Sequence, residues 1–375
     1  MGNMRINEKI RFVSVIAFYI SDYGYGHAAR SVAIIRALCK RKKSAIKVIV
    51  CHSYALEFVA RSLNNQIHSG QVVLRRVRND PGYIMKPFSL EPDKERLKST
   101  YLEFVGRFPQ SVREEIRFLR ENPIDLVIGD IPPVPFMAAS EAGVLSLGIS
   151  NFTWHTAYEH MLEERRLLEE SYQRMDYFFA LAGNNERRWG KKGNLSFGFF
   201  ARGSQADEVK RIRAAVGASS GIRIVFFGLG MNMATKDLAA LNIWRSPNCV
   251  FLVSSNLDIE GENIFHIPDD YTESQNYIAA SDLVITKPGW GIVSEAVSFR
   301  KALILIVRNE MQEDRNTVAF LRRVGPVREV SWDEIKEYQL TEDILRSMQQ
   351  SYNIREDSAT ILAQIVRAID SLLQG

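Results

Sequence analysis

The chain contains only three cysteines among its 375 residues, Cys39, Cys51 and Cys249. They lie far apart in the sequence, and none has a second ligand at the short spacing of a metal-binding motif. This pattern argues against a disulfide framework and against a structural zinc site. We therefore expect a cytoplasmic protein.

Long apolar runs are absent as well. The longest one near the start, Phe12 to Ile20, has nine residues and is soon followed by Asp22. A run of this length fits a β-strand, and it is too short for a membrane span or for the apolar part of a secretion signal.

Neither sign of charge dominates. The 48 Lys and Arg residues against 44 Asp and Glu residues give a net charge of +4, and the basic residues cluster only at 40–43 and 75–78. Solvated helix ends or strand rims would explain these clusters, and attraction to an anionic membrane or substrate is the alternative. We expect no nucleic-acid partner.

The segment 79–93 combines proline, glycine and charged residues, and we expect a long surface loop there. Its apolar residues include Tyr83, Ile84, Met85 and Phe88. Two interpretations stay open: a mobile lid that packs on its own domain, or a weak peripheral contact with a membrane.

What the sequence does contain is a regular alternation of short apolar runs and helical patterns. FVSVIAFYI and KVIVC flank a helical pattern in the first half, and the alternation starts again at GIRIVFFG. The length also exceeds what one hydrophobic core usually organises. The predicted fold class is α/β, with two doubly wound Rossmann-like domains facing a central cleft.

The same alternation places the domain boundaries. We expect an N-terminal Rossmann-like domain at 1–200, a linker at 201–220 and a C-terminal Rossmann-like domain at 221–352. Residues 353–375 are expected to form a C-terminal helix that packs back on the N-terminal domain.

A glycine-rich turn, GYGHAA at 24–29, follows the first predicted strand. It fits the dinucleotide-binding pattern, but the tip of the next strand carries Cys51 and His52 where an acidic residue should hold a ribose. In the other interpretation the glycines lift His27 into the first helical turn, facing the cleft, where it can accept a proton near neutral pH. A histidine that merely packs or caps there is the remaining alternative.

A second glycine-rich turn, VITKPGWGIVSEA at 284–296, connects a strand to a helix in the second half. Free amides at a helix start bind phosphate oxygens, Gly289 and Gly291 allow close approach, and Lys287 adds a positive charge. Glu295 would then reach a ribose diol. The turn FFGLGMN, with Gly228, Gly230 and Asn232, opens the same domain. Ordinary strand–helix connections are the alternative for both turns.

The segment from Thr286 to Glu295 resembles the nucleotide-sugar signature T-H-C-G-W-N-S-x-x-E of the uridine-diphosphate glycosyltransferases, within the GT-B superfamily. It resembles more loosely the corresponding turn of the peptidoglycan N-acetylglucosaminyltransferase. The resemblance implies that Gly289, Trp290, Gly291 and Ile292 hold the diphosphate and that Glu295 holds the ribose. It also implies that the strand end at His266 and Ile267 meets the base through its backbone. Lys287 replaces the histidine of the family signature.

The first half is similar to the glycosyltransferase-like N-terminal half of plant L-arabinokinases. The residues that carry this similarity are YGYGHAAR at 23–30, SNFTWHTAY at 150–158 and the segment from Gly291 to Arg315. The similarity covers most of the chain and leaves out the kinase half. No phosphate-binding loop of a kinase is present, so we expect no kinase activity.

Catalytic roles follow from this resemblance. His27 would be the general base, and Asp130 would orient it, although Asp130 could instead cap the helix that follows. Glu313 and Asp314 would hold sugar hydroxyls, or they are simply acidic residues favoured at a helix start. The residues expected on the acceptor side are Tyr25, Gly26, Trp154 and His155, with a buried aromatic as the alternative for Trp154.

The sequence thus predicts an inverting, metal-independent glycosyltransferase that moves a sugar from a nucleotide-diphosphate sugar, UDP-linked, to an acceptor hydroxyl. The nucleotide sugar is a substrate, and no cofactor is expected. Two alternatives remain: a nucleotide-sugar hydrolase or epimerase on the same fold, and a non-catalytic nucleotide-sugar-binding module. The sequence does not indicate the acceptor or the oligomeric state.

Overall fold

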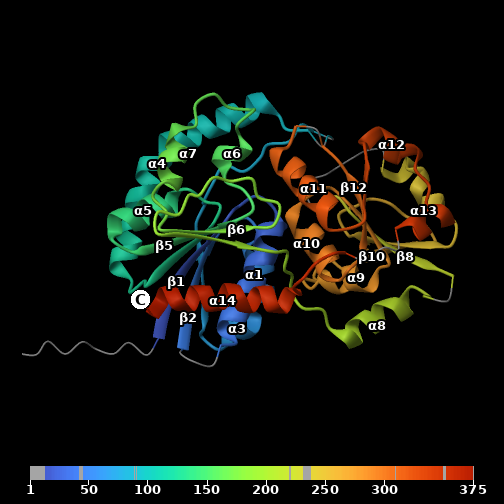
Figure 1. The fold of residues 1–375 in the computed structure, drawn as a ribbon, viewed down its shortest axis with the longest axis horizontal. Helices are drawn as coiled ribbons and strands as arrows, with labels where there is room; N and C mark the ends of the chain where they lie inside the picture. The colour runs from blue at the N-terminus through green and yellow to red at the C-terminus, as the bar shows by residue number, and fades with distance from the viewer. Residues whose placement is uncertain are drawn as a thin grey trace, which may run out of the picture.

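The computed structural model describes residues 13–41, 45–87, 89, 91–218, 221–230, 238–308, 310–348 and 352–374. Within these ranges, two parallel sheets with helices on both faces form two lobes that lie side by side (Figure 1). The predicted α/β class with two doubly wound domains is confirmed.

The N-terminal sheet has the order β3-β2-β1-β4-β5-β6-β7. Its strands are apolar and mostly buried, as expected when helices cover both faces of a parallel sheet. They are β1 (Val13–Ile20), β2 (Ala45–His52), β3 (Val72–Arg76), β4 (Leu126–Asp130), β5 (Leu145–Ser150), β6 (Tyr177–Leu181) and β7 (Gly193–Phe197). The helices of this half are α1 (Tyr25–Cys39), α2 (Leu56–Ser62), α3 (Asn64–His68), α4 (Lys94–Glu121), α5 (Val134–Ala142), α6 (Trp154–Ala157) and α7 (Arg166–Tyr172).

The C-terminal sheet has the order β10-β9-β8-β11-β12-β13. Its strands are β8 (Arg223–Gly228), β9 (Cys249–Ser254), β10 (Ile264–Ile267), β11 (Leu283–Thr286), β12 (Ala302–Ile306) and β13 (Val327–Val330). The helices and 3₁₀ turns are α8 (Ala206–Ala215), η1 (Leu238–Ala240), η2 (Asn242–Arg245), α9 (Gln275–Ala280), α10 (Trp290–Ser298), α11 (Gln312–Val324), α12 (Trp332–Glu337), α13 (Glu342–Ser347) and α14 (Ser358–Gln374).

Each sheet reverses its strand order at one point, between β1 and β4 in the first and between β8 and β11 in the second. In register, Ile20 pairs with Asp130 and Gly228 pairs with Thr286, so the ends of these strands lie together. Ligands of open α/β sheets bind at such reversal points. The loops predicted to carry function leave these four strands.

Helix α14 leaves the C-terminal domain and packs against α1 of the N-terminal domain (Figure 1). At its start, the Ser358 hydroxyl accepts a hydrogen bond from the Ala201 amide at 2.8 Å. Near its end, Asp370 pairs with Arg41. The face with Ile361, Ile365 and Ile369 is buried, because it completes an apolar cluster that runs through both domains.

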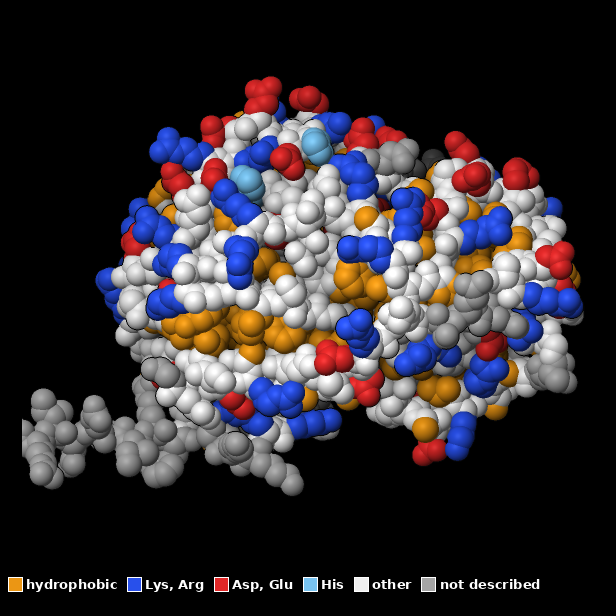
Figure 2. All heavy atoms as spheres, viewed as in Figure 1, with side chains coloured by type: hydrophobic (Ala, Val, Ile, Leu, Met, Phe, Trp, Pro, Cys, Tyr) orange, Lys and Arg blue, Asp and Glu red, His pale blue; other side chains and the backbone are white. Residues whose placement is uncertain are grey.

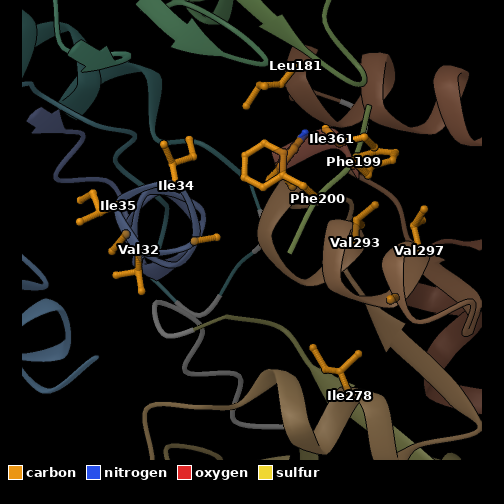
Figure 3. Packing of buried hydrophobic residues seen from close by; sticks show 14 of the residues in the cluster. Val32, Ile34, Ile35, Leu181, Phe199, Phe200, Ile278, Val293, Val297 and Ile361 are labelled. Atoms are coloured by element: carbon orange, nitrogen blue, oxygen red, sulfur yellow. The ribbon is translucent and has the colours of Figure 1, made fainter. Parts of the chain in front are cut away.

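This shared cluster joins the domains behind the cleft. Figure 3 shows α1 on one side and α10, with Val293 and Val297, on the other, with Phe199 and Phe200 between them. The Trp290 indole N–H also donates to the Ala182 carbonyl across the interface at 3.0 Å. The two domains are therefore held together by a buried apolar contact.

The loop 79–93 packs on its own domain. Tyr83 is buried, and Ile84 and Met85 are half-buried against the aromatic cluster of the N-terminal domain. Phe88 lies outside the described residues. Tyr83 is therefore not available to touch lipid in this structure, and its packing agrees with the interpretation in which the loop packs on its own domain.

Lys and Arg side chains are mixed with Asp and Glu side chains over the face seen in Figure 2, and no large area of one sign stands out. A search of the helices in the described ranges finds no segment with the length and apolar character needed to cross a bilayer.

Candidate active site

A cleft of about 570 Å³ lies between the two domains. The loop after β1 and the start of α1 line one wall, and the strand ends and the helix start of the C-terminal sheet line the other. This volume is in the range of small-molecule and cofactor sites.

His27 stands in the first turn of α1 and lines the cleft. The turn before it needs glycine, because Gly24 has φ +74° as the residue that precedes the helix. The imidazole is 6% exposed, and its Nδ1 lies 3.1 Å from Oδ1 of Asp130. The other ring nitrogen, Nε2, is left for a ligand in the cleft.

Asp130 ends β4 next to the end of β1, so the sheet register brings it to His27. It does not cap the next helix, because α5 begins at Val134 with Pro133 as its cap and no side-chain cap bond. The following residue, Ile131, has φ +78°, a strained conformation for a β-branched side chain. Such strain is common where a loop holds a functional group in place.

A third buried group completes this cluster. Arg30, one helical turn after His27, donates through Nε to Oδ2 of Asp130 at 2.7 Å and also binds Oδ1. Its Nη2 lies 2.8 Å from Nδ1 of His27, and its Nη1 donates to Asn151 at 2.6 Å. The carboxylate is therefore shared between a permanent cation and the imidazole.

Burial and the Arg30 cation lower the pKa of His27, and Asp130 opposes this shift. Burial alone would raise the pKa of Asp130, but Arg30 and His27 outweigh it and bring that pKa to about 2. At neutral pH His27 is thus neutral beside an ionised carboxylate. In the tautomer with Nδ1–H directed to Asp130, the neutral imidazole can accept a proton at Nε2, whereas in the tautomer whose Nδ1 accepts from Nη2 of Arg30 it cannot.

The second glycine turn sits across the cleft from His27. Gly289 precedes α10, and Gly291 packs against Gly26 so closely that an added Cβ would lie 2.9 Å from the Gly26 Cα. Gly26, Gly289, Trp290, Gly291 and Ile292 all line the cleft. The amides at the start of α10 are thus next to the loop that carries the histidine.

Lys287 lines the same wall. Its side chain runs beside Gly230, where an added Cβ would lie 3.4 Å from Nζ. Burial lowers the pKa of Lys287 to about 8, with a further contribution from Arg308. Gly228 and Gly230 line the cleft, and Asn232 lies outside the described residues.

Glu295 lies one turn into α10 and is 5% exposed. Its Oε1 accepts bonds from Nη2 of Arg202 at 2.9 Å and from Nε at 3.3 Å. Arg202 also donates to the Thr272 carbonyl at 2.6 Å. Burial raises the pKa of Glu295, and Arg202 opposes the shift. The carboxylate is therefore fixed by one oxygen at the edge of the cleft.

The end of β10 forms the far part of the cleft, where Ile267 and Pro268 line the wall. The side chain of His266 points elsewhere, since its Nε2 lies 2.8 Å from the Ile259 carbonyl. A ligand would meet the backbone of this segment and not the imidazole.

The two acidic residues at the start of α11 differ in position. Glu313 lines the cleft, and burial followed by Asp314 raises its pKa to about 7. Asp314 is 1% exposed, and both of its oxygens bind Arg308. The prediction that Asp314 offers its carboxylate to a sugar is therefore wrong in this structure, because Arg308 occupies it.

Of the four residues expected on the acceptor side, Tyr25 and Gly26 line the cleft, and Trp154 and His155 do not. Trp154 is fully buried and donates its indole N–H to Asp80 at 2.9 Å. His155 stacks edge-on against Trp189, away from the cleft. The placement of Trp154 and His155 along the acceptor side is corrected, because Trp154 is buried in the domain, half-buried His155 packs against Trp189, and neither lines the cleft.

Three arginines of the site, Arg30, Arg202 and Arg308, were not among the predicted functional residues. Arg30 could have been found from its spacing of three after His27 on a helix. Arg308 has a weaker signal, a lone cation directly after an apolar strand. Arg202 has none, since its contact with Glu295 spans 93 residues.

The two doubly wound domains, with a buried histidine–carboxylate pair on one and a glycine-rich helix start on the other, have the arrangement of the GT-B fold. Residues 255–372 match the family model described as the glycosyltransferase family 28 C-terminal domain. The C-terminal part of the chain is therefore similar to the corresponding domain of glycosyltransferases.

One curated relative is similar to most of the chain. The chain is 25% identical over 319 residues to the L-arabinokinase of Arabidopsis thaliana, covering 82% of this chain and 30% of that protein. It thus spans less than a third of the length of this relative.

Among solved structures, UGT89C1 of Arabidopsis thaliana superposes with a TM-score of 0.62 at 12% identity, covering 96% of this chain and 98% of that one. UGT89C1 is also solved complexed with UDP (TM-score 0.59, 11% identity, 95% of this chain and 99% of that one). CalG4, the calicheamicin glycosyltransferase, gives 0.59 at 12% identity, with 96% and 98% covered. At these identities the similarity establishes the fold.

Proposed function

We propose that this protein is an inverting glycosyltransferase whose donor is a UDP-linked sugar and whose acceptor is a hydroxyl. The observation that carries the proposal is the contact between Gly26 and Gly291, which puts the loop of His27 directly against the helix start of α10. A base and a diphosphate-binding turn on facing walls of one cleft suit displacement at an anomeric carbon.

His27 acts as the base. Its Nε2 takes the proton from the acceptor hydroxyl while the acceptor oxygen attacks the anomeric carbon and the bond to the diphosphate breaks. Asp130 holds Nδ1–H and stabilises the imidazolium that forms. Attack from the face opposite the leaving group inverts the configuration.

The leaving diphosphate gains negative charge as the bond breaks. Amides at the start of α10 and the Lys287 ammonium supply fixed positive charge there, which is the kind of stabilisation that usually dominates catalysis. Glu295 accepts bonds from the ribose diol through the oxygen that Arg202 leaves free, and the backbone at Ile267 meets the base. No step of the proposal uses a metal, and activity should survive chelation by EDTA.

A panel of nucleotides tests the donor site. A ligand at a hundred times its Kd stabilises the native state by about 2.7 kcal/mol, so the unfolding midpoint should rise with UDP and less with GDP, CDP or NAD. The rise should be lost in Glu295→Ala. A rise of the unfolding midpoint with NAD and not with UDP would contradict the proposal.

Turnover tests the base. In His27→Ala the rate should fall roughly 10² to 10⁴-fold, the usual range for a positioned general base, while UDP still raises the midpoint. The matched control is His68→Ala, since His68 is an exposed histidine on α3. Full activity in His27→Ala would remove His27 from the mechanism, and binding without turnover by any acceptor would favour a binding module.

A nucleotide-sugar hydrolase is the second candidate. Trp154, Tyr83 and Tyr158 are buried and do not line the cleft, so these aromatic side chains offer no surface to an acceptor. In a hydrolase the same histidine activates water. Free sugar released without any acceptor, at a rate that added acceptors do not change, would select hydrolysis, and a new sugar nucleotide would mean epimerisation.

A further inference from the structure

The guanidinium of Arg308 is only partly used by the protein. Arg308 follows β12, is 7% exposed and lines the cleft. Its Nε and Nη2 donate to the two oxygens of Asp314. Its Nη1 is buried and finds no hydrogen-bond partner among the residues that the structure describes. A buried cationic N–H without a partner is unusual in a native protein, which suggests that a ligand completes it.

The sheet places Arg308 at a defined point along the cleft. Strands β10, β11 and β12 end in this order along one edge, with β9 and β8 between β10 and β11. In the proposed function the base lies at the end of β10 and the diphosphate at the start of α10, after β11. Adjacent strands are roughly 4.8 Å apart, so Arg308 lies one strand beyond the diphosphate, where the sugar ring must be.

The groups at this end of the cleft differ from those expected for a neutral sugar. Hydroxyls are held well by free carboxylates, but Asp314 is occupied by Arg308, which leaves Glu313 and the Nη1 of Arg308. A guanidinium N–H forms a charge-assisted hydrogen bond with a carboxylate, roughly twice as strong as a bond between neutral groups, and its charge is then also matched by an opposite one. Lys287 does not compete for such a group, because the diphosphate faces it.

We propose that Arg308 binds a carboxylate on the sugar ring of the donor, so that the donor is a nucleotide-linked uronic acid. The inference rests on the proposed function, because it needs the diphosphate at α10. It adds the chemical class of the sugar and assigns Arg308 as the residue that selects it.

The neighbours of Arg308 are compatible with a second carboxylate. Glu313 would repel it when ionised, but burial and Asp314 raise the pKa of Glu313 to about 7, so near neutral pH much of it carries a proton. A protonated Glu313 can donate its O–H to the incoming group. Tyr23 lines the same part of the cleft beside Arg308. Burial raises the pKa of Tyr23 to about 12 although Arg308 opposes the shift, which keeps the phenol as a neutral donor.

Calorimetric titration of the wild-type protein with UDP, UDP-glucose, UDP-glucuronate and UDP-galacturonate at pH 6.5 tests the proposal. At least one uronate should bind about tenfold or more tightly than UDP-glucose, the gain expected for one charge-assisted hydrogen bond. Equal or weaker binding of both uronates would overturn the proposal. If UDP itself does not bind, the donor site fails and the proposed function fails with it.

A double variant, Arg308→Met with Asp314→Asn, removes the cation without leaving a buried carboxylate unpaired. It should lose the preference for the uronate and keep the affinity for UDP within about threefold. Arg322→Met is the matched control, since this arginine of α11 pairs with Glu329 at the surface. If the double variant still prefers the uronate, another group binds the carboxylate and the assignment of Arg308 is wrong.

Discussion

The basicity of His27 is set by the arginine one turn away from it. Arg30 binds the same carboxylate as His27 and places a cation beside the imidazole. Both effects disfavour the imidazolium, in agreement with the lowered pKa of His27. The base thus stays neutral, and available, below neutral pH.

Arg30→Met should therefore raise the pKa of His27. In the wild type, activity should hold below the ordinary imidazole pKa of about 6.5, because the pKa of His27 is lowered. In the variant the cation is gone and Asp130 is free to stabilise the imidazolium, so the acid limb of kcat/KM should move to higher pH. A pH profile measured beside the surface variant Arg113→Met checks this, and an unmoved limb would mean that Arg30 only supports the fold.

Lys287 should make nucleotide binding depend on pH. Burial brings its pKa to about 8, so the ammonium that faces the diphosphate is lost as pH rises past this value. The Kd for UDP should increase between pH 7 and pH 9 in the wild type. In Lys287→Met the Kd should be higher at pH 7 and nearly constant over that range. Calorimetry at three pH values is sufficient, and a constant wild-type Kd would contradict the assignment.

At the scale of elements, the two glycine turns work as a pair. A Cβ at position 291 would lie 2.9 Å from the Gly26 backbone, which is closer than real side chains allow. Gly291→Ala should push the loop of His27 away from α10 and lower turnover at least tenfold, because small misplacements of reacting groups are costly. Gly217→Ala is a control for the loss of a glycine, since no atom lies within 4 Å of its added Cβ. Its φ of +66° will reduce stability and leave turnover unchanged.

The elements and part of the site could be predicted from the sequence, because their signals are local. Apolar runs predict the strands. Glycines between a predicted strand and a predicted helix mark the two turns around His27 and Lys287. Asp130 could be placed because it ends an apolar run. A contact between residues that are distant in the sequence has no local signal, so the sequence does not predict the contact of Arg202 with Glu295. Trp154 was misplaced because its neighbours Asp80 and Tyr83 come from a loop about 70 residues away.

At the scale of the whole molecule, α14 joins the domains. Ile365 is fully buried in the cluster that includes residues of both sheets. Ile365→Ala should reduce the free energy of unfolding by about 2–5 kcal/mol, the usual cost of such a cavity. Thermal unfolding should show one transition at a lower midpoint, and Gln364→Ala on the exposed face is the control. Two separate transitions in the wild type would mean that the shared cluster does not couple the domains.

The packing of α14 on α1 also has a consequence for synthesis. Helix α1 ends at Cys39, and helix α14, which packs on it, begins at Ser358. The ribosome must therefore add more than three hundred residues after α1 before it synthesises α14. At 5–20 residues per second this takes roughly 15–65 s. During this time the N-terminal domain has left the exit tunnel, and the apolar face of α1 that packs on α14 is exposed to solvent. Chaperones that hold nascent chains would have a binding surface there until α14 emerges.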